Sequence, residues 1–396
     1  MVDALGILSK AAFKKDRGLY GAGPAITYPQ IPGASDMAAT HMIPFSSETM
    51  TAAYDYLDDP RLIGAGAQLP ADRVSDKVSG GVEGPLAYQG WERLLMCALG
   101  HENPDASPVT LGTGAYAHLF ECDYDLQDRP WLSGDDRVAG GWSANDRKVC
   151  RGQIGFRKQV TDFVFGSSMV NKMTLSGNPK EMKIAFDLIG YDFYLSGYNS
   201  ANWTLPAGSQ ALAIYPQVVF MIGTRAGGTA GLLPYGPSSY EISVDNNLKG
   251  DDQTNASGTH ILQPTRGGMQ VFTFKLTFPR YNSGLTSLLG WADDNTELAG
   301  SIAIGGTSAA PQIGTSGFYH AWNFFMSSIR AKNPQVPITG PAPLTVTVEF
   351  EVFRPSGSDI FNAVPATYYH SIPLKKDSAL IACVHNAFAT NYLLEV

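Results

Sequence analysis

The sequence predicts a mainly β protein with a few short helices, built as two halves that follow the same plan. The chain has 396 residues, longer than a usual single domain, and its 42 Gly, 25 Pro, 19 Phe and 18 Tyr favour short strands joined by turns. Several segments alternate strictly between apolar and polar residues, which is the pattern of a half-buried strand. The order of these features also occurs twice along the chain.

Residues 344–353 give the clearest strand signal, with apolar side chains at every second position. The polar positions between them are Thr345, Thr347, Glu349 and Glu351. The β-forming segment 319–329 precedes this strand, and the connection 330–343 contains four prolines, which a central strand would not tolerate. Together these segments predict one long hairpin with a stiff, extended tip.

An earlier pair of segments predicts a similar hairpin, with residues 169–176 pairing with 182–194 across the turn 177–181. Its apolar stripe comprises Met182, Ile184, Phe186 and Leu188. The opposite face comprises Lys183, Ala185 and Asp187 on one strand and Lys172, Thr174 and Ser176 on the other.

The segments upstream of the two hairpins also resemble each other in order. Gly80 and Gly81 precede a short strand and a helical segment, 89–99, for which Gly100 is the expected C-terminal stop. A second Gly-Gly pair precedes the strand 269–278 and a helical segment at 285–292. The sequence therefore predicts a duplicated architecture of Gly-Gly, strand, helix, strand and long hairpin.

These signals predict two β-sandwich or barrel domains with an arm at each end. The expected divisions are an N-terminal arm 1–40, domains 41–195 and 211–355, a linker 196–210 and a C-terminal arm 356–396. Residues 127–153 are expected to form a long inserted loop. The C-terminal arm is too apolar for a solvated tail, so we expect it to dock on another subunit. Its candidate docking residues are Tyr368, Tyr369, Ile372, Phe388, Tyr392 and Leu393.

Charge and cysteine content argue against several classes of function. The net charge is −8 and only 16% of residues are charged, so the chain lacks the basic clusters that tight DNA binding needs. No apolar run predicts a signal-peptide core or a membrane helix. The four cysteines form no CxxC pair, so we expect no structural metal, no cofactor and no disulfide framework in a protein made in a reducing cytoplasm.

Five segments, taken in order, resemble the phage tail tube proteins of long-tailed phages, and the resemblance covers roughly residues 41–355. The segments are 43–49 (IPFSSET), 80–88 (GGVEGPLAY), 116–120 (YAHLF), the hairpin 169–194 and 240–248 (YEISVDNNL). No single segment is specific, so the weight lies in their order and spacing.

The resemblance implies a two-lobed structural virion protein of the tail, made in the host cytoplasm. In this family the long hairpins join neighbouring subunits into a closed ring barrel, and the rings stack into the conduit for genome delivery. Six lobes per ring would make this subunit a trimer, with a hexamer as the other possibility. Implied partners are further copies, tape measure and terminator proteins, and DNA that passes without specific binding. The candidate lumen-lining residues are Lys172, Thr174, Ser176, Lys183, Asp187, Thr345, Thr347, Glu349 and Glu351.

Other features of the sequence point to two different classes of function. A β-sandwich capsid, decoration or adhesion protein of a virion is the alternative with the same composition. Residues 306–311 (GTSAAP) resemble the nucleophile motif of subtilisin-like proteases, but the proline comes one place early and His260 lies too close in sequence to Ser308. A serine without a positioned base is inert, so we expect no catalytic residues.

Overall fold

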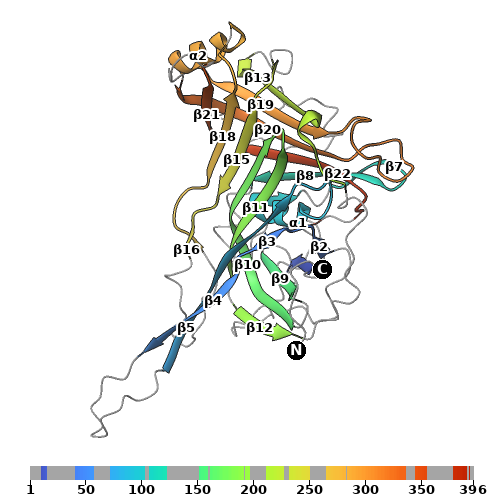
Figure 1. Cartoon of the computed structure of the whole chain (residues 1–396), viewed down its shortest axis with the longest axis vertical. Helices are drawn as coiled ribbons and strands as arrows, with labels where there is room; N and C mark the ends of the chain where they lie inside the picture. The colour runs from blue at the N-terminus through green and yellow to red at the C-terminus, as the bar shows by residue number, and fades with distance from the viewer. Residues whose placement is uncertain are drawn as a thin grey trace, which may run out of the picture.

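The chain folds as a mainly β protein with two short α-helices among the described residues, as the sequence predicts (Figure 1). The computed structural model describes residues 10–15, 41–57, 72–102, 107–122, 151–158, 161–190, 192–196, 211–226, 232–249, 265–281, 283–335, 344–354, 378–389 and 392.

Among its described residues, the first half of the chain contains twelve strands and the helix α1 (Glu92–Leu99). The strands are β1 (Lys10–Lys15), β2 (Met42–Ile43), β3 (Ser47–Glu48), β4 (Thr51–Leu57), β5 (Asp72–Pro85), β6 (Gly100–Glu102), β7 (Val109–Gly112), β8 (Ala115–Cys122), β9 (Arg151–Lys158), β10 (Thr161–Asn178), β11 (Glu181–Gly190) and β12 (Asp192–Ser196).

The described part of the second half contains the helix α2 (Thr286–Asp293) and two 3-10 turns, η5 (Tyr215–Gln217) and η7 (Ser283–Leu285). Its strands are β13 (Val218–Thr224), β14 (Leu233–Tyr235), β15 (Ser239–Asp245), β16 (Leu248–Lys249), β17 (Thr265–Arg266), β18 (Val271–Phe278), β19 (Leu298–Gly305), β20 (Ala321–Gln335), β21 (Val346–Val352) and β22 (Leu380–Asn386).

Strand β10 belongs to two sheets. Its first half pairs with β9 and β12, and its second half pairs with β11 and β15. At Met169 the strand is paired with Arg151 of β9 and Ile189 of β11 at once, so these two neighbours lie on opposite sides of it. The strand therefore leaves one sheet and continues into the next.

Strand β20 repeats this arrangement in the second half of the chain. Its first half lies between β19 and β22, and its second half pairs with β21. At Ile329 the strand is paired with Leu298 of β19 and Val352 of β21. Beyond these strands, β1 and β2 extend from β9 as β13 and β14 extend from β19. The order of strand pairings therefore recurs along the chain.

The second halves of β10 and β20 meet in one sheet that both halves of the chain share. Its eight strand positions, in order, are β4 with β3, β5, β11, β10, β15, β18, β21 and β20. In Figure 1 these strands run along the long axis of the molecule, and the β4–β5 hairpin projects from its lower left. The sheet is not closed, because no described pairing joins β3 or β4 to β20.

The buried face of this shared sheet forms the core. Burial alternates along β11 as the sequence predicts. Met182, Ile184, Phe186 and Leu188 are all buried. Phe186 stacks on Trp91 before α1, with ring centroids 5.8 Å apart. Helix α1 ends at Gly100, which has a φ of 106° and donates its N–H to the carbonyl of Met96. This left-handed stop is the one that the sequence predicts.

Three sequence expectations need correction. Strand β20 does not stop at residue 329 but continues to Gln335, and Pro334 is accommodated at a shift in register between Lys332 and Gln335. The predicted N-terminal arm contains β1, whose residues Ala11 and Phe13 are buried in the core. The predicted C-terminal arm contains β22, which inserts between β8 and β20.

The last three residues of the predicted inserted loop, 151–153, are instead the first three residues of β9. The rest of that loop and the predicted linker except Ser196 lie outside the described part of the chain. Within the two arms, only residues 10–15, 378–389 and 392 are described. The strands missed in both arms are largely buried but lack alternation, and β1 contains three lysines among its six residues. They follow from tertiary contacts that the local sequence does not encode.

The two Gly-Gly pairs provide a stability test. Gly80 has a φ of +146°, and a Cβ there would lie 2.4 Å from the carbonyl oxygen of Thr49. We expect Gly80→Ala to destabilise the subunit by about 1–3 kcal/mol, because the added methyl group clashes with backbone. Urea unfolding measures the change.

The matched control is Gly268→Ala. No neighbouring atom lies closer than 3.7 Å to its added Cβ, and its φ is outside the left-handed region. Its expected effect is within about 0.5 kcal/mol. Equal losses of stability in the two variants would contradict the steric argument.

Candidate functional site: the polar face of the shared sheet

The second face of the shared sheet is polar across its whole width. Lys172 of β10 pairs with Asp187 of β11 on one side and with Asp245 of β15 on the other. Ser176 likewise pairs with Lys183 and Glu241. Cross-strand partners share one face of a sheet, so these side chains form rows that run perpendicular to the strands.

The rows continue through the second half of the chain. Glu241 pairs with Lys275 of β18, Lys275 with Glu349 of β21, and Glu349 with Lys332 of β20. A parallel row passes through Ser243, Thr273, Glu351 and Arg330. Residues from both predicted hairpins thus lie on one continuous surface.

Eight of the nine predicted lumen-lining residues lie in strands of this surface. Lys172, Thr174 and Ser176 are in β10, Lys183 and Asp187 in β11, and Thr347, Glu349 and Glu351 in β21. Thr345 is exposed just before β21 begins.

Residues of β15, β18 and β20 that belong to this surface are absent from the predicted lumen-lining set. These residues are Glu241, Ser243, Asp245, Thr273, Lys275, Arg330 and Lys332. Alternation in β15 and β18 could have identified most of them. Their position beside the hairpins depends on long-range pairing, which the local sequence does not reveal.

Charges of opposite sign alternate on this surface. The rows contain five basic residues (Lys172, Lys183, Lys275, Arg330 and Lys332) and six acidic ones (Glu83, Asp187, Glu241, Asp245, Glu349 and Glu351). Lys332 lies 3.6 Å from the carboxylate of Glu351, between Nζ and Oε2. Partial burial raises the pKa of Asp187, Lys172 lowers it, and Asp245 raises it further. The near balance leaves no basic track that would hold phosphates.

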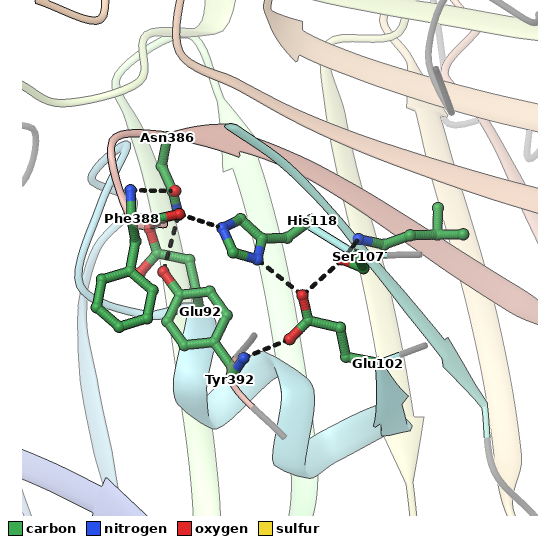
Figure 2. Close-up of polar contacts among 8 residues, drawn as sticks. Glu92, Glu102, Ser107, His118, Asn386, Phe388 and Tyr392 are labelled. Carbon is green, nitrogen blue, oxygen red and sulfur yellow. Dashed lines mark hydrogen bonds and ion pairs between the residues drawn. The ribbon is translucent and has the colours of Figure 1, made fainter. Parts of the chain in front are cut away.

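A second polar cluster is buried and anchors the end of the chain (Figure 2). Oε1 of Glu102 accepts a hydrogen bond from Ser107 at 2.6 Å and lies 2.7 Å from Nδ1 of His118. Its other oxygen accepts the backbone N–H of Tyr392 at 2.6 Å. Nε2 of His118 faces the carbonyl oxygen of Phe388 at 2.8 Å. Both ring nitrogens of His118 therefore face an oxygen atom, one from the Glu102 side chain and one from the Phe388 backbone.

Neighbouring contacts fix the same segment from the other side. Asn386 donates to Glu92 at 3.2 Å and to the hydroxyl of Tyr392 at 2.8 Å. Burial raises the pKa of Glu92. The ring of Tyr392 lies 4.7 Å from those of His118 and Phe388, and the Arg93 guanidinium lies 5.3 Å from the Tyr392 ring.

This cluster corrects the predicted role of two arm residues. Phe388 and Tyr392 dock on their own chain, because Glu102 and His118 provide a buried site there. Tyr368, Tyr369, Ile372 and Leu393 lie outside the described residues. The Ser107 hydroxyl donates to a carboxylate and accepts from Leu119 N, an arrangement of a structural network.

The described residues contain no grouping of three or more His, Cys, Asp or Glu suited to a metal ion. Ser308 is exposed in the turn between β19 and β20, and His260 lies outside the described residues. Within the part of the chain that the structure covers, no helix is both long and apolar enough to span a membrane.

Replacing Tyr392 tests the anchor. We expect Tyr392→Ala to cost about 3–5 kcal/mol, because it removes a fully buried ring from the cluster. Tyr392→Phe keeps the ring and loses one hydroxyl contact, so about 1 kcal/mol is expected. Hydrogen exchange of the amides of residues 386–389 measures local release. Unchanged protection of these amides in Tyr392→Ala would contradict the anchor.

Comparison with known proteins agrees with this architecture. The profile of the family described as "Phage tail tube protein" matches residues 18–352, which is most of the chain. A search of curated proteins found no match. The matched range includes all eight strand positions of the shared sheet and both hairpins. The chain therefore belongs to the phage tail tube protein family, and it is a structural protein of the virion tail.

Proposed function

We propose that the chain is a two-lobed tube subunit, three copies of which close into a ring with six similar lobes. The repeated order of strand pairings supports this division, with β1–β12 in one lobe and β13–β22 in the other. Each lobe contributes four strand positions to the shared sheet. The first contributes β4 with β3, β5, β11 and β10, and the second contributes β15, β18, β21 and β20.

Ring closure follows from the two ends of the shared sheet. An open sheet of eight strand positions has two edges whose backbone groups favour pairing with another chain. Three copies of eight strands give 24. With strands about 4.8 Å apart and tilted about 40°, such a barrel measures roughly 48 Å across between backbones. That width would leave a channel after side chains are added.

The polar face suits the inner wall of this channel. The other face is filled by buried apolar side chains such as Phe274 and Phe350, whose ring centroids are 5.4 Å apart. A wet lumen requires a polar face, and mixed charges avoid a strong grip on a polyanion. The single observation that favours this function is the continuous polar face that both lobes share. In this proposal the rings stack, DNA passes inside, and tape measure and terminator proteins are the tail partners.

Electron microscopy of the purified protein tests the assembly. We expect negative-stain images to show rings or tubes of uniform inner diameter, because the backbone groups at both edges of the sheet can pair with another copy. A protein that remains a monomer at all concentrations would refute the proposed assembly.

Cysteine labelling tests which face lines the lumen. Glu351→Cys should react with a small maleimide in both free subunits and tubes. A maleimide joined to a bulky polymer should react with the free subunit but not inside long tubes. The wild-type chain is the blank for its own cysteines. Equal reaction of the bulky reagent with tubes and free subunits would place this face outside.

A further inference from the structure

We infer that the edge of β20 pairs with the β3–β4 edge of a second copy, with Ala331 opposite Met50. This inference rests on the proposed ring and specifies which strands join and in what register. Lys332 then lies opposite Thr49, and Arg330 opposite Thr51, both on the polar face.

The first observation is an edge on β20. Its residues after Ile329 pair with β21 on one side. On its other side, β20 pairs with β19 only up to Ile329. Beyond Ile329, no described strand pairs with that side of β20. The β3–β4 edge lies at the opposite end of the shared sheet, and its described pairings are all with β5.

The second observation is that the same junction already exists inside the subunit. Strand β10 occupies in the first lobe the position of β20 in the second, and its matching edge is covered by β15. Strand β15 in turn pairs with β18 as β3 and β4 pair with β5. The β10–β15 contact is thus an internal template for the contact between copies.

The β10–β15 contact predicts the register of the contact between copies, because Phe186 of β11 and Phe350 of β21 occupy equivalent positions. Phe186 pairs with Met173 of β10, and Phe350 pairs with Ala331 of β20, so Met173 corresponds to Ala331. On their other sides, Phe186 pairs with Val82 and Phe350 with Phe274.

The correspondence then extends to the opposite edge. Val82 pairs with Glu48, and Phe274 pairs with Ile242, so Glu48 corresponds to Ile242. Two residues further on, Met50 corresponds to Val244. Because Met173 pairs with Val244 within the subunit, Ala331 should pair with Met50 of the next copy.

Backbone hydrogen bonds provide an independent check. In a strand the N–H and C=O of one residue point to the same side, and successive residues alternate. Phe353 N donates to the carbonyl of Ser328, so Ser328 faces β21 and Ala331 faces the open edge. Thr49 N donates to the carbonyl of Gly81, so Thr49 faces β5 and Met50 faces outward. The two residues that the template pairs therefore both present backbone groups to the junction.

The side chains also agree with this junction. Met50 is buried on the apolar side of the sheet, where the small Ala331 would meet it. The Met50 N–H is bonded to Oε2 of Glu48 at 3.0 Å in the single subunit. Glu48 also forms an ion pair with Lys158. In the second lobe the corresponding residue is the apolar Ile242, at an edge that is already covered.

Disulfide trapping tests the register. We expect the double variant Thr51→Cys with Arg330→Cys to form covalent dimers and trimers on oxidation of assembled rings. A disulfide needs Cα atoms within about 7 Å. Within one subunit the two positions are separated by seven strand intervals, about 33 Å along the sheet, so the bond joins different copies. The matched control is Ser47→Cys with Arg330→Cys, whose partners would be offset by four residues, roughly 13 Å.

The outcomes separate this inference from the proposed function. Covalent trimers in the first variant but not in the control support the register. Rings that form but cross-link only in the control, or in neither variant, overturn the register and leave the tube function standing. A wild-type protein that forms no rings overturns both.

A second variant avoids dependence on disulfide chemistry. Ala331→Pro removes an N–H that faces the open edge, so the hydrogen bonds to β21 are retained. We expect a folded subunit with an unchanged circular dichroism spectrum and complete loss of rings. Rings that still assemble from Ala331→Pro would overturn the inference.

Discussion

The constraint on which this structure depends is that every strand of the shared sheet must find a partner for its backbone N–H and C=O groups. The subunit satisfies this requirement internally at seven junctions by combining strands from both halves of the chain. The long strands β10 and β20 make this possible, because each leaves one group of strands and continues into the common sheet. The same requirement leaves two edges, which provide the physical basis for assembly.

Alternation along the strands divides the shared sheet into two environments. One face packs Phe186, Phe274 and Phe350 into the core, while the other has near-balanced rows of opposite charge. Each cross-strand pair of this kind contributes only modestly. Stability comes mainly from the apolar face, so the side chains of the polar face are not needed to fill the core. The buried Glu102–His118 cluster then joins Phe388 and Tyr392 to β6 and β8, which helps to hold β22 between β8 and β20.

Much of this fold could be predicted from local sequence. The alternation at residues 346–352 and 181–190 and the helix stop at Gly100 specify local geometry, and the structure agrees with them. The first Gly-Gly pair lies inside β5 and does not precede a strand as expected. The strands β1 and β22 could not be predicted, because they are buried on both faces and lack alternation. Nor could the Glu102–His118 pair be predicted, because its members meet only when β6 pairs with β8. The polar face was found in part, since its width depends on pairings between residues that are distant in sequence.

The hydrogen bond from Met50 to Glu48 has a consequence for the order of events during growth. The Glu48 side chain occupies the Met50 N–H, so this hydrogen bond must break before a strand of another copy can pair with Met50. In the proposed ring, two dissolved copies that meet would bear this cost at an isolated junction, whereas a copy that joins a partly built ring would recover it through several contacts at once. Growth on an existing end would then be faster than spontaneous initiation. The Glu48 carboxylate would thus help to keep free subunits dispersed until a template is present.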